Sequence, residues 1–406
     1  MPKTVALLGA LDTKGDEYAF VKQCIEARGH RTLLVDTGII APPKTPPDVT
    51  RQEVAAAAGT SIEALVARND RGEALAAMSR GVAALVPRLF AEGKFDAIMA
   101  LGGGGGTSVA CAAMRALPLG VPKVMVSTVA GGDVSHYVGL KDIVMVPSIV
   151  DVSGINRISR EVFARAAGAI CGMLETEVPP CETRPIVVAS MFGNTTICVE
   201  AAKRILEEAG YEVLVFHATG AGGRTMEGLI ESGMVAGVLD ITTTEWADEL
   251  VGGVFPAGPT RLEAAARCGV PAIVTPACLD MVNFWAPETV PEKFCGRTFY
   301  QHNPNVTLMR TNPEECRELG RIVAEKLNLS RGPVTVLLPL KGWSVIDSPG
   351  GPFWWPEADG AFCAALRERL RKDVPVIEME CNVNAAEFST VCAETLLRLM
   401  GASTDA

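Results

Sequence analysis

Short runs of apolar, often β-branched residues alternate with amphipathic stretches along the whole chain, a pattern typical of βα units built around parallel sheets. In the first half this pattern predicts strands at Thr4–Gly9, Thr32–Asp36, Ala97–Gly102, Lys123–Ser127 and Ile143–Val146. In the second half it predicts strands at Ile186–Ser190, Val213–Phe216, Gly237–Ile241, Ala272–Thr275, Val306–Met309, Val334–Pro339 and Val374–Ile377. We therefore expect an α/β fold of two doubly wound, Rossmann-like parallel-sheet domains facing a cleft.

A proline-rich segment separates the two series of strands. Residues 175–185 (ETEVPPCETRP) carry three prolines and four charged residues, which neither a helix nor a central strand accepts readily. We therefore expect one domain over residues 1–178 and a second α/β domain over residues 186–406. The segments Val5–Gly38 and Val187–Gly220 have similar sequence patterns. The similarity reflects either an internal repeat or the general likeness of any two βαβ units.

Composition narrows the class of protein. Apolar residues make up 48% of the 406-residue chain and charged residues 21%, which favours a compact fold over a disordered chain. The 37 basic and 47 acidic residues give a net charge of −10, so we expect no nucleic-acid partner. We find no apolar run of the roughly 20 residues that span a bilayer and no signal sequence, so we expect a cytoplasmic protein with no membrane partner. The twelve cysteines form no CxxC pair and fit reduced core residues.

The sharpest local motif is a run of glycines between a predicted strand and a predicted helix. Gly102, Gly103, Gly104, Gly105 and Gly106, followed by Thr107, come directly after the apolar strand. Glycine permits positive φ and a close approach to the backbone, and a helix start offers free N–H groups and a partial positive charge. No lysine follows, so the motif is not a P-loop, and Thr107 interrupts a GxGxxG spacing. Five glycines exceed what a tight turn needs, which predicts a phosphate site.

Other polar loops are expected at the same carboxyl edge of the first sheet. After the first strand, Asp12 or Thr13 fits a helix cap and Lys14 a phosphate ligand, although each also fits an ordinary capped helix with a solvated lysine. After the second strand, Asp36 can accept hydrogen bonds from ribose hydroxyls. The loops after the fourth and fifth strands carry Thr128, Gly131, Gly132 and Asp151. Their convergence predicts a nucleotide pocket.

A long stretch of this region also resembles a known family. The strings GGGGGTSVACAAMRALPLGVPKVMVSTVAGGDVSHYVG and DIVMVPSIVDVSGINRISREVF, with the opening VALLGALDTKGDE, are similar to the plant tobamovirus-resistance protein family and its bacterial homologues. The resemblance covers essentially the whole chain and is strongest over residues 97–165. It implies ATP binding in the amino-terminal Rossmann-like domain, by the Asp12-Thr13 loop, Gly103–Thr107, Thr128, Gly131 and Gly132. The plant relative inhibits a viral replication protein, and nothing in this sequence indicates that role.

The second half offers separate candidates. Gly222, Gly223, Arg224 and Thr225 combine glycines at a helix start with an arginine, which fits either a second anion site or a glycine-rich turn with a surface arginine. As catalytic groups we consider Asp240, Glu245, His302, in a polar loop before a strand, and Lys341. Helix capping and surface exposure explain the same residue types. All five tryptophans lie here, in expected loops that suit a ligand pocket or an oligomer interface.

Together these features predict an ATP-binding protein with the nucleotide phosphates on Gly102–Thr107. Mg²⁺ would be held through the phosphates and a carboxylate such as Asp12 or Asp151. The second domain would bind a small anionic metabolite that the protein acts on or senses, and the chain would form a homodimer or a larger homo-oligomer. The alternative is a nucleotide-gated protein-interaction module without turnover. We find no Ser-His-Asp order and no HExxH motif, which removes the best-known hydrolase and zinc templates.

Overall fold

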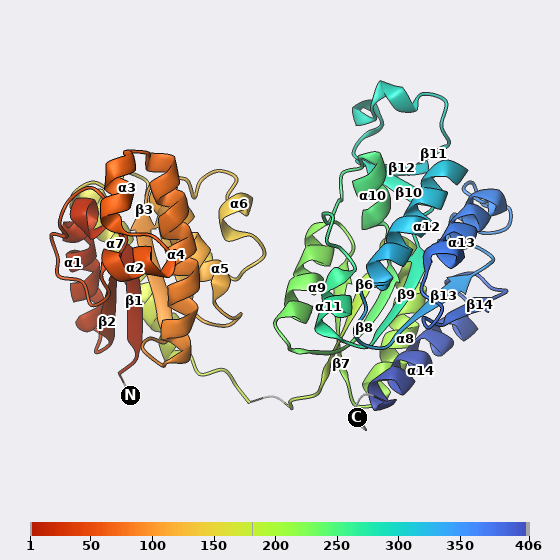
Figure 1. Cartoon of the computed structure of the whole chain (residues 1–406), viewed down its shortest axis with the longest axis horizontal. Coiled ribbons are helices and arrows are strands. Elements are labelled where there is room, and N and C mark those ends of the chain that lie inside the picture. The colour runs from red at the N-terminus through yellow and green to blue at the C-terminus, as the bar shows by residue number, and fades with distance from the viewer. Residues whose placement is uncertain (1, 181, 403–406) are drawn as a thin grey trace. The chain divides into compact units, whose positions relative to one another are not determined.

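The structure is a computed structural model that describes residues 2–180 and 182–402. These residues form two compact units, of which the first ends at Pro180 (Figure 1). Each unit has its own sheet and its own hydrophobic core. Residues 176–180 and 182–185, between the last helix of the first unit and the first strand of the second, lie outside helices and strands.

The first unit contains a five-stranded, fully parallel sheet with the order β2-β1-β3-β4-β5. Its strands are β1 Thr4–Gly9, β2 Arg31–Asp36, β3 Ala97–Gly102, β4 Lys123–Ser127 and β5 Val144–Pro147. Three of them have the bounds expected from the sequence and two are displaced or extended by one residue. The Rossmann-like parallel architecture predicted for this half is confirmed.

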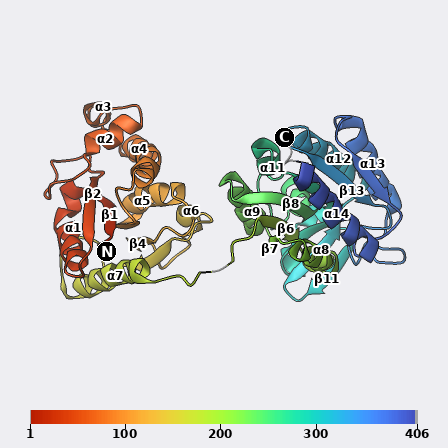
Figure 2. The same cartoon turned by 90° about the horizontal axis from the view of Figure 1, so that it is seen from below.

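Helices cover both faces of this sheet, as Figure 2 shows from below. The first unit has one hydrophobic core on each face of the sheet, and alternate residues of β1 point into one or the other. Ala6 and Leu8 pack with α2, α4 and α5, whereas Val5 and Leu7 pack with α1 and α7. Burial on both faces explains the uninterrupted apolar strands. The helices are α1 Leu11–Glu26, α2 Arg51–Ala57, α3 Ile62–Arg68, α4 Arg71–Ala91, α5 Gly104–Ala116, α6 Ser135–Val138 and α7 Arg157–Glu175.

Within the described part of the chain, α4 is the one helix long and apolar enough to cross a membrane by length and composition. Its apolar residues, including Met78, Val82 and Leu85, are buried in the core of the first unit. The helix therefore serves as a core helix of an α/β domain of the kind found in soluble proteins.

The second unit contains a six-stranded parallel sheet with the order β14-β13-β9-β8-β6-β7. Its strands are β6 Ile186–Met191, β7 Glu212–His217, β8 Val235–Thr242, β9 Ala272–Ala277, β13 Val334–Pro339 and β14 Val376–Met379. All six were expected, with bounds that differ by up to two residues at either end.

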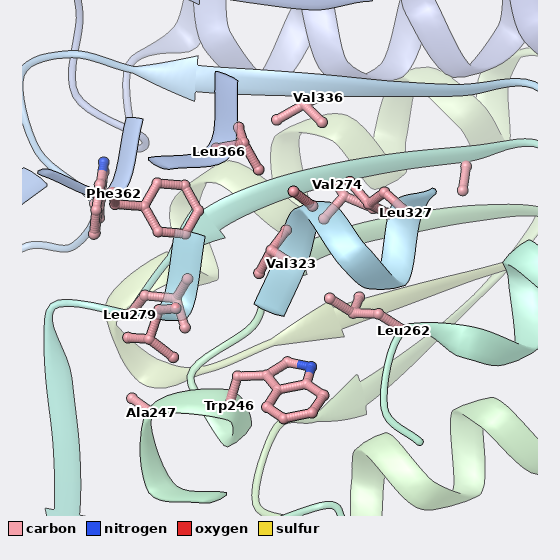
Figure 3. Close-up of a cluster of buried hydrophobic side chains, with 14 of the residues drawn as sticks. Trp246, Ala247, Leu262, Val274, Leu279, Val323, Leu327, Val336, Phe362 and Leu366 are labelled. Carbon is pink, nitrogen blue, oxygen red and sulfur yellow. The ribbon is translucent and has the colours of Figure 1, made fainter. Parts of the chain in front are cut away.

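Helices again cover both faces. One core joins Val274 and Val336 of the sheet to Trp246, Val323 and Leu366 of the covering helices (Figure 3). The other core lies under α8 and α14. The helices are α8 Thr196–Glu208, α9 Ala221–Glu231, α10 Glu245–Val251, α11 Glu263–Cys268, α12 Pro313–Leu327, α13 Pro356–Arg369 and α14 Ala386–Ala402, with short 3₁₀ turns η1 Gly193–Thr195, η2 Pro287–Thr289 and η3 Glu292–Phe294.

One expected strand belongs to a different sheet. Val306–Met309 was assigned to the parallel sheet, but β12 (Val306–Arg310) is the centre of a three-stranded antiparallel sheet with the order β10-β12-β11. Its neighbours β10 (Met281–Phe284) and β11 (Phe299–Asn303) were not predicted. Both are short, and β11 has no apolar alternation, so neither shows the periodic pattern on which the prediction relied.

The two parallel sheets share a topological feature that positions ligand sites. In each sheet the first strand lies between the second and the third. Successive strands are therefore added to one side of the first strand and then to the other, with the switch between β1 and β3 in the first sheet and between β6 and β8 in the second. Ligands of open α/β sheets bind at the carboxyl ends of the strands at this switch point. The loops after β1, β3, β6 and β8 are therefore where a site is expected.

Candidate functional site

A cavity of about 730 Å³ opens in the first unit beside the β1–β3 switch point. Volumes of about 300–1,000 Å³ are usual for small-molecule sites. The cavity is lined by the starts of α1 and α5, which follow β1 and β3, by the loop after β2, by α3 and α4, and by Asp151 after β5. Of the residues predicted from the sequence, it is lined by Asp12, Thr13, Lys14, Gly103, Gly104, Gly105, Gly106 and Asp151.

The start of α5 supplies hydrogen-bond donors to this cavity. Gly103 is the residue before the helix, and no side chain caps it. Within the described part of the chain, the backbone N–H groups of Gly104, Gly105 and Gly106 have no acceptor. Helix starts with free N–H groups carry a partial positive charge and bind anions.

The glycines of this turn are not needed for backbone conformation. No residue from Gly102 to Gly106 has a positive φ, so that part of the expectation is wrong. A Cβ on Gly103, Gly104 or Gly106 would meet nothing nearer than 3.5 Å. Alanine would also form the helix better than glycine. Packing within the chain therefore does not explain these three glycines, whereas a ligand that approaches the backbone closely would.

Arg71, which was not predicted, brings a positive charge to the same place. It lines the cavity from the first turn of α4, and one of its Nη atoms lies 3.9 Å from where a Cβ on Gly105 would be. The guanidinium has no hydrogen-bond or ion-pair partner among the described residues. A free guanidinium beside free helix N–H groups is suited to a phosphate.

Aliphatic side chains form another part of the lining, the apolar wall of the cavity. Leu65 and Val66 come from α3, Ile39 and Ile40 from the loop after β2, and Leu75 from α4. Val66 and Ile40 are 55% and 79% exposed, which is unusual for large aliphatic side chains. The cavity thus combines free N–H donors and a guanidinium with an apolar wall that could contact a flat heterocycle.

Asp12 and Lys14 line the cavity but already have partners. Asp12 Oδ2 accepts hydrogen bonds from the backbone N–H groups of Ile40 and Ala41, at 2.8 and 3.2 Å, and so fixes the loop after β2. Lys14 Nζ donates to the carbonyl of Val152. Neither residue caps α1, which begins at Leu11 after Ala10 without a side-chain cap.

The other predicted nucleotide ligands lie outside the cavity lining. Asp36 is fully buried; its Oδ1 accepts from the N–H groups of Leu11 and Gly38, at 3.1 and 2.8 Å, and burial raises the pKa of its carboxyl. Thr107 is buried and bonds Ser127 Oγ at 2.6 Å, which ties α5 to β4. The remaining four are Gly102, packed against Gly106, and the turn residues Thr128, Gly131 and Gly132.

The glycine-rich turn of the second unit binds a carboxylate side chain of the protein itself, that of Glu245. Glu245 Oε1 accepts hydrogen bonds from the backbone N–H groups of Gly220 and Gly223, at 2.7 and 3.0 Å, where α9 begins. A Cβ on Gly223 would lie 2.1 Å from Glu245 Oε2, and a Cβ on Gly222 would lie 1.9 Å from the carbonyl oxygen of His217. Packing within the chain therefore explains these glycines.

The two other residues predicted for that site lie on the outer side of α9. Arg224 Nη1 donates to the Pro256 carbonyl at 2.8 Å, and Thr225 Oγ1 donates to the Ala221 carbonyl at 2.8 Å. Both side chains therefore donate to backbone carbonyls of the chain itself.

Asp240 and Glu245 are brought together by Arg261, which sequence reasoning missed. Arg261 Nη1 and Nη2 each donate to Asp240 at 2.6 Å, and Nε donates to Glu245 at 2.7 Å. Glu227 lies 3.1 Å from the same guanidinium, and burial raises the pKa of its carboxyl. This buried ion network joins α9, β8 and α10 and leaves neither candidate acid open to solvent.

His302 and Lys341 are not part of that network. His302 lies in the exposed strand β11, not in the loop expected from the sequence. Lys341 is exposed and pairs with Glu380 at 3.0 Å. Trp246 and Trp343, expected in loops that suit a pocket, are buried in the core of the second unit.

Sequence comparisons match both units to the same protein family. Residues 3–179 match the N-terminal domain and residues 184–400 the C-terminal domain of the uncharacterised protein family (UPF0261). A UPF0261 protein of Clostridium tetani is 50% identical over 402 residues, 98% of this chain and 100% of that protein. The tomato (Solanum lycopersicum) ToMV resistance protein Tm-1(GCR237) and the ToMV susceptible protein tm-1(GCR26) are each 40% identical over 337 residues, 81% of this chain but 45% of theirs.

Proposed function

The chain belongs to the uncharacterised protein family (UPF0261), and on that premise we propose that it is an ATP-binding protein whose first unit holds the nucleotide. The phosphates bind the N–H groups of Gly104, Gly105 and Gly106 and the guanidinium of Arg71, and the adenine lies against the apolar wall of the cavity. The observation that carries this proposal is the contrast between the two glycine-rich turns. The chain's own contacts explain Gly222 and Gly223, whereas a Cβ on Gly103, Gly104 or Gly106 would meet only ordinary van der Waals contacts at 3.5 Å or more.

The charge of the cavity supports a polyphosphate with a divalent cation. Asp151 lines the cavity, is exposed, and has no partner among the described residues. Mg²⁺ is bound by one or two carboxylates together with substrate phosphates. Asp151 is therefore our choice of ligand, because Asp12 is occupied by backbone N–H groups.

Isothermal titration of the purified full chain with ATP and Mg²⁺ tests the proposal, with AMP and NAD as comparisons. We expect ATP to bind at one site per chain and AMP to bind at least about tenfold more weakly, since AMP lacks the phosphates that would reach Arg71. Absence of nucleotide binding would refute the proposal.

The second candidate function is a nucleotide-gated interaction module without turnover. The observation that favours it over an enzyme is that Asp240 and Glu245 are buried against Arg261, while His302 and Lys341 lie elsewhere on the surface. An enzyme that acts on a small anionic metabolite bound by the second unit would need groups not yet identified. Release of phosphate from ATP, measured with and without a panel of small anionic metabolites, distinguishes the two.

The names of the tomato relatives do not extend to this chain. One is a resistance protein and the other a susceptible protein, and both are 40% identical to it over the same length. What the three chains share therefore cannot account for resistance, and we propose no antiviral role.

A further inference from the structure

A tyrosine hydroxyl lies between the first and third strands of the first sheet, at the point where their pairing ends. β1 and β3 pair as far as Leu8 and Ala100. The next N–H group of β3, that of Leu101, donates to Tyr18 Oη at 2.8 Å, and Tyr18 Oη donates to the carbonyl of Leu8 at 2.6 Å. In a continued parallel ladder, the N–H of Leu101 would donate to Leu8 directly. The hydroxyl therefore takes the place of one ladder hydrogen bond and bridges its two partners.

The sheet splits at this hydroxyl, because the pairings on either side of it continue further. β1 pairs with β2 through Gly9 and Asp36, and β3 pairs with β4 through Gly102 and Ser127. Between β1 and β3, by contrast, the described residues form no pair beyond Leu8. The split thus lies at the switch point of the sheet, where a ligand site is expected.

Segments on both sides of the split line the cavity of the first unit. Ala10 and Gly38 follow β1 and β2, whereas Leu101 belongs to β3 and Gly103–Gly106 to the turn and helix start that follow it. The separation of β1 from β3 therefore sets how far the free N–H groups of α5 lie from the loops after β1 and β2. Tyr18 itself is fully buried and does not line the cavity, so a ligand in the cavity would not touch it.

Gly9 makes room for the hydroxyl. A Cβ on Gly9 would lie 2.0 Å from Tyr18 Oη, so a larger residue there would displace the phenol. Burial raises the pKa of the Tyr18 phenol, which therefore keeps the proton that it donates to Leu8. Phenylalanine would fill the same core position with the same ring and would need no hydrogen-bond partner. Core packing alone therefore does not explain the hydroxyl, whereas the bridge between β1 and β3 does.

We propose that Tyr18 is a positioning residue for the nucleotide, whose hydroxyl holds the ends of β1 and β3 apart and so places the N–H groups of Gly104–Gly106 within reach of the phosphates. This inference rests on the proposed function of the first unit. Without the hydroxyl, the N–H of Leu101 can donate directly to Leu8, which draws the two strand ends together. Because α5 begins two residues after the end of β3, its start moves with that strand end.

Isothermal titration of the full chain with ATP and Mg²⁺ tests the proposal. Tyr18→Phe keeps the ring and removes the hydroxyl, and at a temperature at which it is folded it should bind ATP at least about tenfold more weakly than the wild type. The matched control is Ile170→Ala. Ile170 is buried in the same core, but near the end of α7, where Glu175 pairs with His30 at the opposite end of the sheet. The control should lower the melting temperature and leave the ATP affinity unchanged.

Equal ATP affinity of Tyr18→Phe and the wild type would overturn this role and leave the nucleotide site standing, whereas a wild-type chain that binds no ATP would refute both. If Tyr18→Phe does not fold, fluorine NMR of the wild-type chain labelled with 3-fluorotyrosine replaces it. The Tyr18 resonance, identified by elimination with phenylalanine variants of Tyr137, Tyr211 and Tyr300, should shift when ATP is added, although the ligand does not touch Tyr18. An unchanged resonance at saturating ATP would overturn the proposal.

Discussion

The carboxylate of Glu245 accepts a hydrogen bond from the backbone N–H of Gly223, 3.0 Å away, at the start of α9. The same carboxylate pairs with the buried guanidinium of Arg261. The Glu245 side chain of the protein itself thus occupies the start of α9, whose glycine-rich sequence is typical of an anion-binding site. Two elements of the second unit, α9 and α10, are held together by this contact.

We predict that Glu245→Ala destabilises the second unit by about 3 kcal/mol, because a buried guanidinium loses one of its partners and two N–H groups lose their acceptor. Formate, which resembles the deleted carboxylate, should raise the melting temperature of the variant more than that of the wild type. The control is Glu231→Ala, an exposed carboxylate at the other end of α9, which should melt like the wild type. Equal melting of both variants would contradict the role assigned to Glu245.

Gly104→Ala should separate stability from ligand binding. The added Cβ would meet only Tyr137 Oη, at 3.5 Å, so the helix gains up to about 1 kcal/mol, while a phosphate on the free N–H groups is displaced. We expect a melting temperature that is unchanged or higher and an ATP affinity at least about tenfold lower. Gly172→Ala in α7, where a Cβ meets nothing within 4 Å, should gain stability and bind ATP normally. Normal ATP binding by Gly104→Ala would exclude this helix start as the phosphate site.

The sequence was most informative where strands are buried on both faces. Ala97–Gly102 is apolar throughout because helices cover both sides of β3, and its bounds were predicted without error. β11 was missed because its five exposed residues lack that pattern and its pairing with β12 depends on tertiary structure. Local periodicity reports burial, so an exposed edge strand leaves no comparable signal.

The candidate site was predictable only in part for a similar reason. The loops after β1 and β3 follow strand ends, which sequence patterns locate, so Asp12, Thr13 and Gly103–Gly106 were found. Arg71 lies more than thirty residues before Gly105 in the sequence and reaches it only through the packing of α4 on α5. Equally, no sequence pattern shows that the Glu245 carboxylate accepts from the N–H groups at the start of α9, whereas those at the start of α5 have no acceptor among the described residues.

Arg71→Ala should weaken ATP binding by about 10–100-fold, the range expected for loss of a hydrogen bond to a charged group. Added salt should weaken the wild type more than the variant, since the lost contact is electrostatic. Arg80→Ala is the matched control, because Arg80 is also an exposed arginine of α4 but does not line the cavity. The same loss of affinity in both variants would show that net charge, not the position of Arg71, governs binding.

The pH dependence of stability should reveal the protonation of Asp248. Its carboxylate accepts from the N–H groups of Asn283 and Phe255, at 2.7 and 2.8 Å, yet burial raises its pKa to about 7, and nearby Glu245 adds to the shift. The folded state therefore keeps a proton that the unfolded chain loses above a pKa of about 4. Since the folded state binds more protons, this group's contribution to stability decreases as the pH rises from about 4 to about 7.

Asp248→Asn should remove that contribution, at most about 1.4 kcal/mol per pH unit, although the amide costs stability at every pH because it is a poorer acceptor. Tryptophan fluorescence during urea unfolding measures it, because all five tryptophans lie in the second unit. Buried Asp359, with a pKa raised to about 7 by desolvation, contributes the same slope to both proteins and cancels in the difference. The free energy of unfolding should thus fall less steeply with pH in the variant. Parallel curves for the two proteins would mean that Asp248 is ionised in the folded state throughout this range.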